Sequence, residues 1–201
     1  MDTFKKERTL VVIKPDGLQR TLVGEILKRY ERTGLKLVAM KMMVPSSDLV
    51  EKHYLLDPEW IRKVGEKSID SYKKKGQKPP TEDSIALGKG VVEVLKRYLT
   101  SGPVIAMIWQ GAHAVEVVRK ITGSTEPRSS DVGTIRGDFV IDSYPLADIS
   151  GRAIRNLIHA SGTVDEAKGE IGLWFTDKEI INYRLVQEEI LYDVNLDGIL
   201  E

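Results

Sequence analysis

Hydrophobic residues recur along the chain with two periods, which together predict alternating strands and helices. Apolar, β-branched runs at residues 9–13 and 103–109 are typical of buried strands. Residues 35–44 alternate lysines with apolar residues, which predicts a strand with one face in water. The Pro-Asp-Gly run within residues 14–17 predicts a turn, and residues 138–141 predict one more short strand.

Apolar residues spaced three and four apart predict amphipathic helices between these strands. The helical segments begin at capping residues or end at glycines, and they are 22–34, 46–54, 57–76, 91–99, 112–121 and 163–170. The remaining segments are rich in polar residues, glycine or proline. They predict a linker at 78–83, a polar loop at 122–137 and an irregular stretch at 142–151.

The order of these elements favours an α+β fold. Two strands separated by helices in each half predict a ferredoxin-like βαββαβ antiparallel sheet covered by helices on one face. A chain of 201 residues predicts a single domain, 1–201.

Composition narrows the class of protein. The chain is 41% hydrophobic and 30% charged, as in ordinary globular proteins, and its formal net charge is zero, so nucleic acid is an unlikely partner. It has no cysteine, which excludes disulfides and thiolate chemistry. No apolar run approaches the ~20 residues that span a bilayer, and the first residues lack the apolar core of a secretory signal. We therefore expect a cytoplasmic protein without membrane contact.

His159 is the leading candidate for chemistry among only three histidines. Thr163 and Glu166 have the spacing of a capping box, which predicts that a helix starts just after the histidine. His159 would then lie at the edge of a turn, where a rigid scaffold often presents catalytic groups. A lone histidine between apolar residues is, however, more often a buried, hydrogen-bonded side chain, so the pattern alone leaves both readings open.

Several separate segments carry groups suited to an anion. Arginine forks match phosphate oxygens, and glycine-containing loops let backbone N–H groups approach them. The common phosphate-binding motifs are absent, including the Walker A pattern and G-x-G-x-x-G. Solvated surface groups are the alternative for each residue. The candidates are Lys14, Arg119, Thr125, Arg136 and Asn156.

Lys14, Arg136 and Asn156 belong to longer motifs that follow one another along the chain. These motifs are Glu7-Arg8-Thr9, Ile13-Lys14-Pro15-Asp16-Gly17, Leu22-Val23-Gly24-Glu25-Ile26, His53-Tyr54, Gly133-Thr134-Ile135-Arg136-Gly137-Asp138-Phe139, Asn156-Leu157-Ile158-His159-Ala160-Ser161 and Glu170-Ile171-Gly172-Leu173-Trp174-Phe175. With these motifs, which span nearly the whole chain, the sequence resembles the nucleoside diphosphate kinase family.

The resemblance implies transfer of the γ-phosphate of ATP or another nucleoside triphosphate to a nucleoside diphosphate, in ping-pong fashion through phospho-His159. It implies that Glu170 hydrogen-bonds the far ring nitrogen and that Ser161 holds Glu170. A histidine with an ordinary pKa of about 6.5 is largely neutral at pH 7, so a ring nitrogen can attack phosphorus without a general base. The phosphate-binding set implied is Lys14, Tyr54, Arg119, Thr125 and Arg136, with Lys14 and Asn156 at the ribose hydroxyl.

The sequence departs from the family pattern at the base site. Val91 stands where the family usually has a phenylalanine that stacks on the base. The base is therefore held more loosely, or an aromatic residue takes over from a helical hairpin insertion at about 57–90, with Trp60 or Tyr72 as the candidates. A second insertion at 142–151 precedes the histidine segment.

The metal site also differs, since Gly162 replaces a common aspartate. We therefore assign no protein ligand to Mg²⁺ and expect nucleotide phosphates and water to hold it. Residues 193–198 mimic the start of an EF-hand loop, but the chain ends before its glutamate, so they predict a tail turn.

Family members commonly assemble as tetramers or hexamers built from dimers, with residues 121–136 and the C-terminal tail near subunit contacts. We expect self-association of the same kind. The missing aromatic residue and the insertions keep a second hypothesis open, a nucleotide-binding scaffold or sensor with reduced activity. Transfer to partner proteins is a third.

Overall fold

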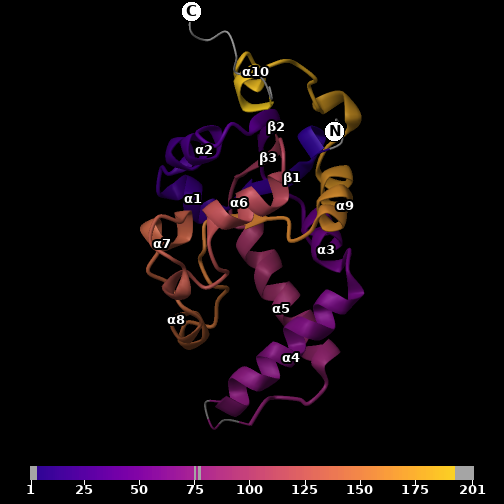
Figure 1. Cartoon of the computed structure of the whole chain (residues 1–201). Helices are drawn as coiled ribbons and strands as arrows, with labels where there is room; N and C mark the ends of the chain where they lie inside the picture. Colours follow the sequence, from indigo (N-terminus) through magenta and orange to yellow (C-terminus); the bar gives the residue numbers. More distant parts are fainter. Residues whose placement is uncertain (1–3, 75, 77, 193–201) are drawn as a thin grey trace, which may run out of the picture.

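A four-stranded antiparallel sheet forms the centre of the molecule. The computed structural model describes residues 4–192 except 75 and 77. Strands β1 (Arg8–Ile13), β2 (Lys36–Met43), β3 (Val104–Gln110) and β4 (Ile158–Ala160) lie in the order β2-β3-β1-β4, and all neighbours are antiparallel. This arrangement confirms the predicted α+β fold and has the ferredoxin-like strand order. Figure 1 shows the helices around the sheet.

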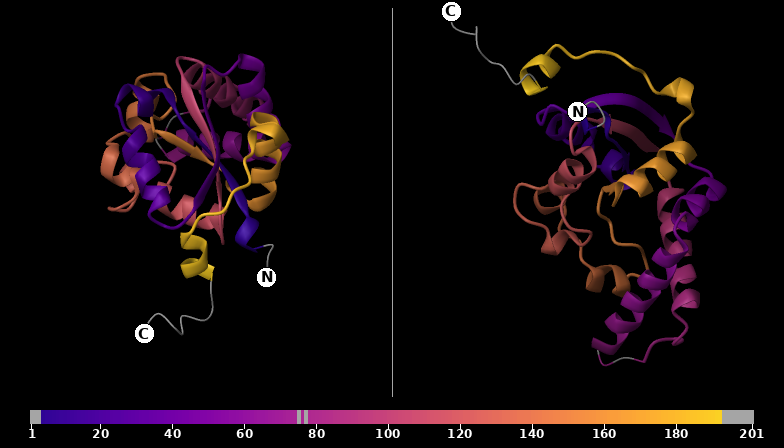
Figure 2. Two further views of the ribbon diagram at one scale, coloured as in Figure 1. Left: turned by 90° about the horizontal axis from the view of Figure 1, so that it is seen from above. Right: turned by 45° about the vertical axis from the view of Figure 1, so that its right-hand side comes forward.

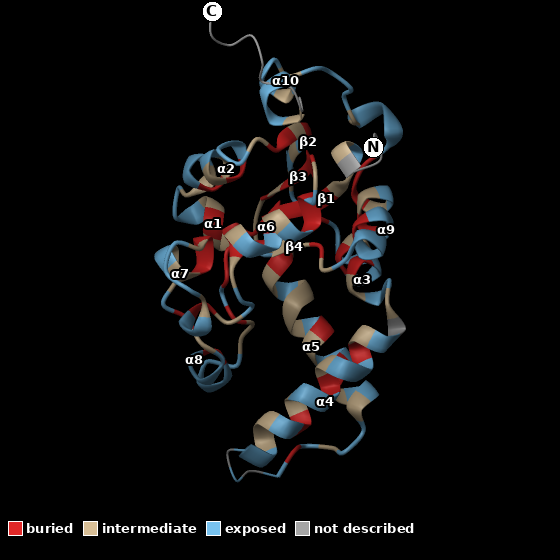
Figure 3. Cartoon of the chain, in the orientation of Figure 1, coloured by how far each residue is buried: buried red, intermediate tan, exposed pale blue. Residues whose placement is uncertain are grey.

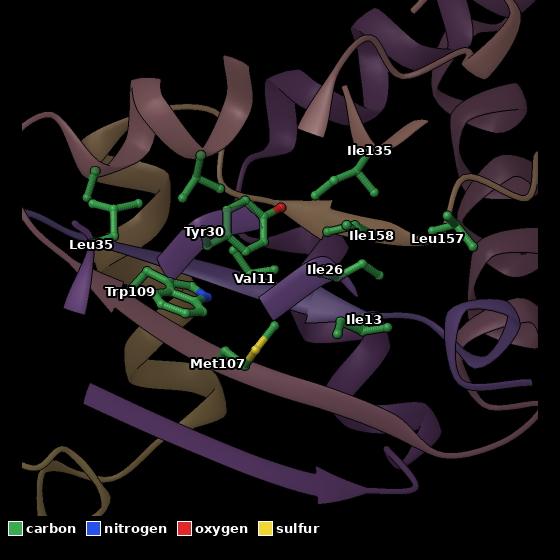
Figure 4. Close-up of a cluster of buried hydrophobic side chains, with 12 residues drawn as sticks. Val11, Ile13, Ile26, Tyr30, Leu35, Met107, Trp109, Ile135, Leu157 and Ile158 are labelled. Atoms are coloured by element: carbon green, nitrogen blue, oxygen red, sulfur yellow. The ribbon is translucent and has the colours of Figure 1, made fainter. Parts of the chain in front are cut away.

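Helices cover both faces of the sheet, so the expectation of one covered face was wrong. Val11 and Ile13 of β1 pack into a core beneath α2 (Val23–Glu31), α6 (Ala114–Thr122) and α7 (Ile135–Phe139), which Figure 4 shows. The alternate residues of β1 face a second core that includes Trp174 of α9 (Val164–Trp174) and residues next to α3 (Ser47–Leu55). Because side chains alternate across a strand, β1 contributes to both cores. Figure 3 shows buried residues in the sheet and in the helices beside it.

Side-chain caps set several helix starts, as the sequence predicts. The Ser46 hydroxyl accepts from Leu49 N–H at the start of α3, and Thr163 accepts from Glu166 N–H at the start of α9. The Glu166 carboxylate reaches back one residue further than a capping box requires, to Gly162 N–H at 2.7 Å. The helix after the histidine therefore starts where predicted, but it continues past Glu170 to Trp174.

Helices α4 (Pro58–Lys74) and α5 (Ser84–Leu99) form an arm that extends away from the sheet (Figures 1 and 2). The two helices cross closely at glycines. A Cβ added to Gly65 would lie 1.7 Å from Ser84 O, and one added to Gly88 would lie 2.2 Å from Ile61 O. Helix α5 begins at Ser84, ahead of Val91, the first apolar residue of the predicted pattern, because Asp83 caps it by accepting from the backbone N–H groups of residues 85 and 86.

Three local predictions were wrong. Residues 15–17 belong to a short helix, α1 (Pro15–Gln19), with Lys14 as its N-cap, rather than to a turn. Residues 138–141 form no strand, because Thr134 caps α7 and Asp138 accepts from Gly133 N–H at 2.8 Å. The 142–151 stretch contains a helix, α8 (Tyr144–Ile149), that Ser143 caps.

The remaining elements are short. They are the 3-10 helices Phe4–Lys6, Pro127–Ser129 and Asp177–Glu179, and the helix α10 (Gln187–Tyr192). The tail turn predicted at 193–198 lies outside the described residues. Within the described part of the chain, every helix is too short or too polar to cross a membrane.

Candidate active site

A strained turn leads into the strand that carries His159. Leu157 has φ = 65°, and Ile158 N–H donates to Asn156 O across it at 2.7 Å. The Leu157 carbonyl accepts from Lys14 N–H at 2.7 Å, and the Leu157 N–H donates to Asp16 Oδ2 at 3.2 Å. These bonds hold a conformation that a non-glycine residue rarely adopts. His159 itself lies in β4, where it pairs with Val12 of β1, so the prediction that it lies at a turn was wrong.

The sheet and α9 bring His159, Glu170 and Ser161 together. His159 Nε2 lies 2.8 Å from Glu170 Oε1, and Ser161 Oγ donates to Glu170 Oε2 at 2.5 Å. Burial alone would raise the pKa of Glu170, but the charges of His159 and His53 and the hydrogen bonds from His159 and Ser161 lower it to about 2. An ionised carboxylate only accepts, so His159 Nε2 carries the proton and Nδ1 has the lone pair. Among the described residues, none hydrogen-bonds Nδ1.

A second histidine, which the sequence analysis did not assign, lies against the first. The rings of His53 and His159 are edge to face, with centroids 4.4 Å apart. Trp174 Nε1 donates to His53 Nδ1 at 3.2 Å, so the proton of the neutral ring is on Nε2, which lies 3.8 Å from Glu170 Oε1. Burial and the positive charges of His159 and Lys14 lower the pKa of His53 to about 3, against the opposing effect of Glu170. His53 is therefore neutral at physiological pH.

Lys14 and Asn156 meet in a buried pair 142 residues apart in sequence. Lys14 Nζ donates to Asn156 Oδ1 at 2.7 Å and lies 5.2 Å from the ring centroid of Tyr98. The amide of Asn156 donates to Thr125 O at 2.9 Å. Burial and the charge of Arg136 lower the pKa of Lys14 to about 7, although Asp16 opposes the shift. A small change in the surroundings therefore decides the charge of Lys14 at neutral pH.

Arg136 is buried and its guanidinium group is almost fully engaged. It donates to four backbone carbonyls, those of Asn156, Gly123, Ser124 and Ile158, over 2.5–3.1 Å. Burial lowers its pKa to about 10, so it stays charged at pH 7. With five N–H donors in total, one is left for a ligand. Arg136 thus fixes the 123–124 loop against the turn before His159.

Arg119 and Thr125 lie at the exposed edge of this region. Arg119 lines a hollow of about 360 Å³ together with Gly162 and Thr163, which follow β4. Its charge acts on Arg136 and helps to lower the pKa of that buried side chain. Thr125 is exposed, while its carbonyl holds Asn156. The structure therefore places these two residues beside the buried group, at its solvent side.

Tyr54 is next to His53 at the end of α3, and the two rings are edge to face at 4.9 Å. Burial and the Glu170 carboxylate raise the pKa of Tyr54, so its hydroxyl keeps its proton and can donate. Trp60 of the arm stacks on Tyr54, with ring centroids 5.3 Å apart and planes at 25°. Val91 is half-buried on α5 and offers no ring. Tyr72 is three turns further along α4 than Trp60, about 18 Å at 1.5 Å per residue.

His53, His159 and Glu170 have the residue types of a metal site, since ligand atoms of all three lie within 4.8 Å of one another. The hydrogen bonds disfavour that use, because Trp174 leaves the proton of His53 on Nε2 and Glu170 is bonded to His159 and Ser161. A Cβ added to Gly162 would lie 2.4 Å from Glu166 Oε2. The Glu166 carboxylate therefore fills the space in which an aspartate side chain at 162 would begin.

Four residues of this region had no role assigned from the sequence, and they differ in whether the sequence contained a pattern that could have indicated one. His53 precedes Tyr54 in one of the family motifs, so its position in that motif was a usable signal. Asp16 also lies in a motif, but its bond to the Leu157 backbone required the fold. Trp174 also lies in a motif, at residues 170–175, but its bond to His53 required the fold. Tyr98 has helical, apolar surroundings in the sequence, and that pattern predicts a core residue only.

Comparison with known proteins agrees with this geometry. A sequence model described as nucleoside diphosphate kinase matches residues 7–59 and 85–180. A nucleoside diphosphate kinase from Pyrobaculum aerophilum is 44% identical over 179 residues, which cover 87% of this chain and 98% of that protein. The crystal structure of an NDP kinase from P. aerophilum superposes with a TM-score of 0.85 at 41% identity, covering 88% of this chain and all of that one.

A structure from Borrelia burgdorferi, described as a transition-state mimic with bound vanadate and ADP, superposes with a TM-score of 0.73 at 36% identity. It covers 91% of this chain and 95% of that one. Both the family match and the identities extend over most of the chain. The chain therefore belongs to the nucleoside diphosphate kinase family and is a nucleoside-diphosphate kinase.

Proposed function

We propose that Nδ1 of His159 accepts the γ-phosphate of a nucleoside triphosphate and passes it to a nucleoside diphosphate. The observation that carries this proposal is the 2.8 Å contact between His159 Nε2 and Glu170 Oε1. The contact fixes the tautomer and leaves the Nδ1 lone pair for attack. Ser161, which donates to Glu170 and accepts from the Leu10 N–H of β1 at 3.1 Å, fixes the carboxylate to the sheet.

In the first half-reaction, the Nδ1 lone pair forms a bond to the γ-phosphorus. The bond from that phosphorus to the bridging oxygen breaks, and its electron pair leaves with the diphosphate. The imidazole ring becomes more positive during attack, and the buried carboxylate of Glu170 offsets that charge. The second half-reaction reverses these steps with another diphosphate, so the same groups serve both directions.

The cationic groups align and neutralise the phosphates, which is the main demand of phosphoryl transfer. Lys14 regains its proton when an anion approaches, since its pKa lies near neutrality. Arg136 supplies charge and its one remaining N–H, and it holds the loop that contains Thr125. Arg119 and Tyr54 complete the phosphate contacts, and Asn156 binds the ribose hydroxyl beside Lys14.

Mg²⁺ fits this site as a partner of the nucleotide rather than of the protein. Both oxygens of Glu170 are hydrogen-bonded, and Gly162 has no side chain. The nucleotide phosphates and water would therefore hold Mg²⁺, which would neutralise phosphate charge when bound. The residues of this chain orient the phosphates around it.

We also propose that 1–201 is one domain with insertions at about 57–90 and 142–151, and that the protein self-associates as a tetramer or hexamer built from dimers. The outer edge of the sheet supports self-association, because β2 lies at that edge and exposes Met40 and Met42. We propose a cytoplasmic location as well, which is compatible with the absence of cysteine from the sequence. Light scattering at micromolar concentration tests the assembly, and a monomeric mass would contradict it.

Phosphate transfer through His159 is tested by labelling with [γ-³²P]ATP and Mg²⁺. We expect an acid-labile, alkali-stable label that added GDP removes, and we expect His159→Ala to acquire none. His113→Ala, which removes an exposed histidine at the residue before α6, is the control and should take up label normally. Label that still forms and transfers in His159→Ala would refute the proposal.

A further inference from the structure

One aromatic residue of the arm connects it to the catalytic histidine. Trp60 belongs to residues 60–84, which the family model leaves unmatched. Its indole stacks on Tyr54, with centroids 5.3 Å apart and an interplanar angle of 25°. Tyr54 contacts His53, and His53 contacts His159, with centroid distances of 4.9 and 4.4 Å. A continuous row of four rings therefore runs from the arm to His159.

The position of Trp60 is fixed by its own helix. Asp57 caps α4, since its Oδ1 accepts from Glu59 N–H at 2.9 Å and its carbonyl accepts from Trp60 N–H at 3.1 Å. The next residue, Ile61, is buried, and its carbonyl lies against Gly88 of α5 where no side chain would fit. The first turn of α4 is thus locked onto α5 at the level of Trp60.

The same α5 helix continues into the nucleotide site. Tyr98, near its end, lies beneath Lys14 with its ring centroid 5.2 Å from Nζ. Val91 offers no aromatic face on this helix, whereas Trp60 offers one that covers Tyr54. The arm therefore contributes a ring to the wall of the site that the family motifs alone do not contain.

We propose that Trp60 is a positioning residue for nucleotide binding, which holds the ring of Tyr54 so that its hydroxyl keeps a defined place beside the phosphates. The proposal rests on the proposed role of Tyr54 in binding the phosphates of nucleoside di- and triphosphates. Stacked aromatic pairs contribute beyond their buried area, so the indole restrains Tyr54 more strongly than an aliphatic side chain would. The insertion then acts on substrate affinity through one defined contact.

Steady-state kinetics of the full chain test this role. Trp60→Ala should raise the KM for GDP by about two- to tenfold, with a smaller change in kcat, whereas Trp60→Phe keeps a ring and should stay within about twofold. Tyr72→Ala, on the same helix but about 18 Å away, is the control and should change neither constant. In a Tyr54→Ala background, Trp60→Ala should add nothing. An unchanged KM in Trp60→Ala, or additive effects in the double variant, would overturn the proposal.

Fluorescence gives a second test that needs no destabilising variant. Trp109 and Trp174 are buried, with exposures of 0% and 3%, while Trp60 is half-buried. ADP should therefore change the tryptophan emission of the unaltered protein, and Trp60→Phe should reduce that change to the part that comes from Trp174, whose indole contacts His53. Emission that ignores ADP, or that responds equally in Trp60→Phe, would contradict a contact between Trp60 and the site.

Labelling separates this proposal from the catalytic one. Trp60→Ala should still form the phosphoenzyme at saturating ATP, because His159 and Glu170 are unaltered. Label on His159→Ala would refute the catalytic proposal but leave the effect of Trp60 on KM to be judged separately. Trp60→Ala without label at any ATP concentration would instead show that Trp60 does more than position Tyr54, and would refute the positioning role.

Discussion

Acid should destabilise this protein through His53 before any carboxylate titrates. His53 is 5% exposed, and burial and neighbouring positive charge lower its pKa to about 3. In the unfolded chain the same side chain has its ordinary pKa of 6.5. Between these values the unfolded state binds a proton that the folded state refuses. Protonation of His53 in the unfolded state therefore has no effect above pH 6.5. It lowers the free energy of unfolding steadily as the pH falls from 6.5 to about 3.

The size of this effect follows from the two pKa values. At about pH 4.5 the unfolded histidine is two pH units below its pKa, which corresponds to a loss of about 3 kcal/mol. Glu170 acts in a lower window, because its pKa falls from 4.5 to about 2 in the folded state. Its stabilisation is present above pH 4.5 and is lost as the pH falls through about 2. Between pH 6.5 and 4.5 His53 therefore acts without Glu170.

Urea unfolding followed by circular dichroism, at one protein concentration and several pH values from about 7 to 4.5, measures this window. His53→Gln keeps a group that can accept from Trp174, but it does not titrate. Its free energy of unfolding should fall by about 3 kcal/mol less than that of the unaltered protein over this range. His113→Gln retains His53 and should retain the acid sensitivity. Equal losses in His53→Gln and the unaltered protein would refute the reasoning.

Two further predictions concern Lys14 and the arm. Since the pKa of Lys14 lies near 7, binding of ADP at about pH 8 should take up a proton. The heat of binding measured by calorimetry should then vary with the ionisation enthalpy of the buffer. Lys14→Met should remove most of that variation. Equal buffer dependence in both proteins would count against a shifted Lys14. Gly88→Ala should lower the free energy of unfolding by about 1–3 kcal/mol, because its Cβ would lie 2.2 Å from Ile61 O. Gly90→Ala, at a position with no atom within 4 Å, should raise it by about 0.5–1 kcal/mol, and equal effects at the two glycines would contradict the close crossing.

Periodicity located the long elements because their pattern and packing agree. The runs at 9–13 and 103–109 form β1 and β3, and the apolar stripe after Leu22 becomes α2. The two strands bury side chains against the covering helices, and α2 buries its apolar stripe against the sheet, so the hydrophobic pattern records the tertiary contacts directly. Caps such as Ser46 add a local signal that does not depend on the rest of the fold.

The short elements were not predicted because residues far away in the sequence determine whether they form. Strand β4 has three residues, too few for an alternating pattern, and it exists because residues 158–160 pair with residues 11–13 of β1. Residues 138–141 have the more strand-like composition, yet Asp138 is held by Gly133 and by an ion pair with Arg29 at 2.5 Å. Pairing with a neighbour outweighs intrinsic preference for strands of this length.

The site could be named from motifs, but its chemistry depends on distances that no motif contains. The spacing of residues in the sequence does not indicate that Arg136 donates four hydrogen bonds to backbone carbonyls, or that Trp174 fixes the tautomer of His53. These bonds leave Arg136 with one N–H donor and fix His53 in one tautomer, whereas Nδ1 of His159 has no hydrogen-bond partner among the described residues. A motif therefore predicts which residues gather, and burial and hydrogen bonding determine what each can do there.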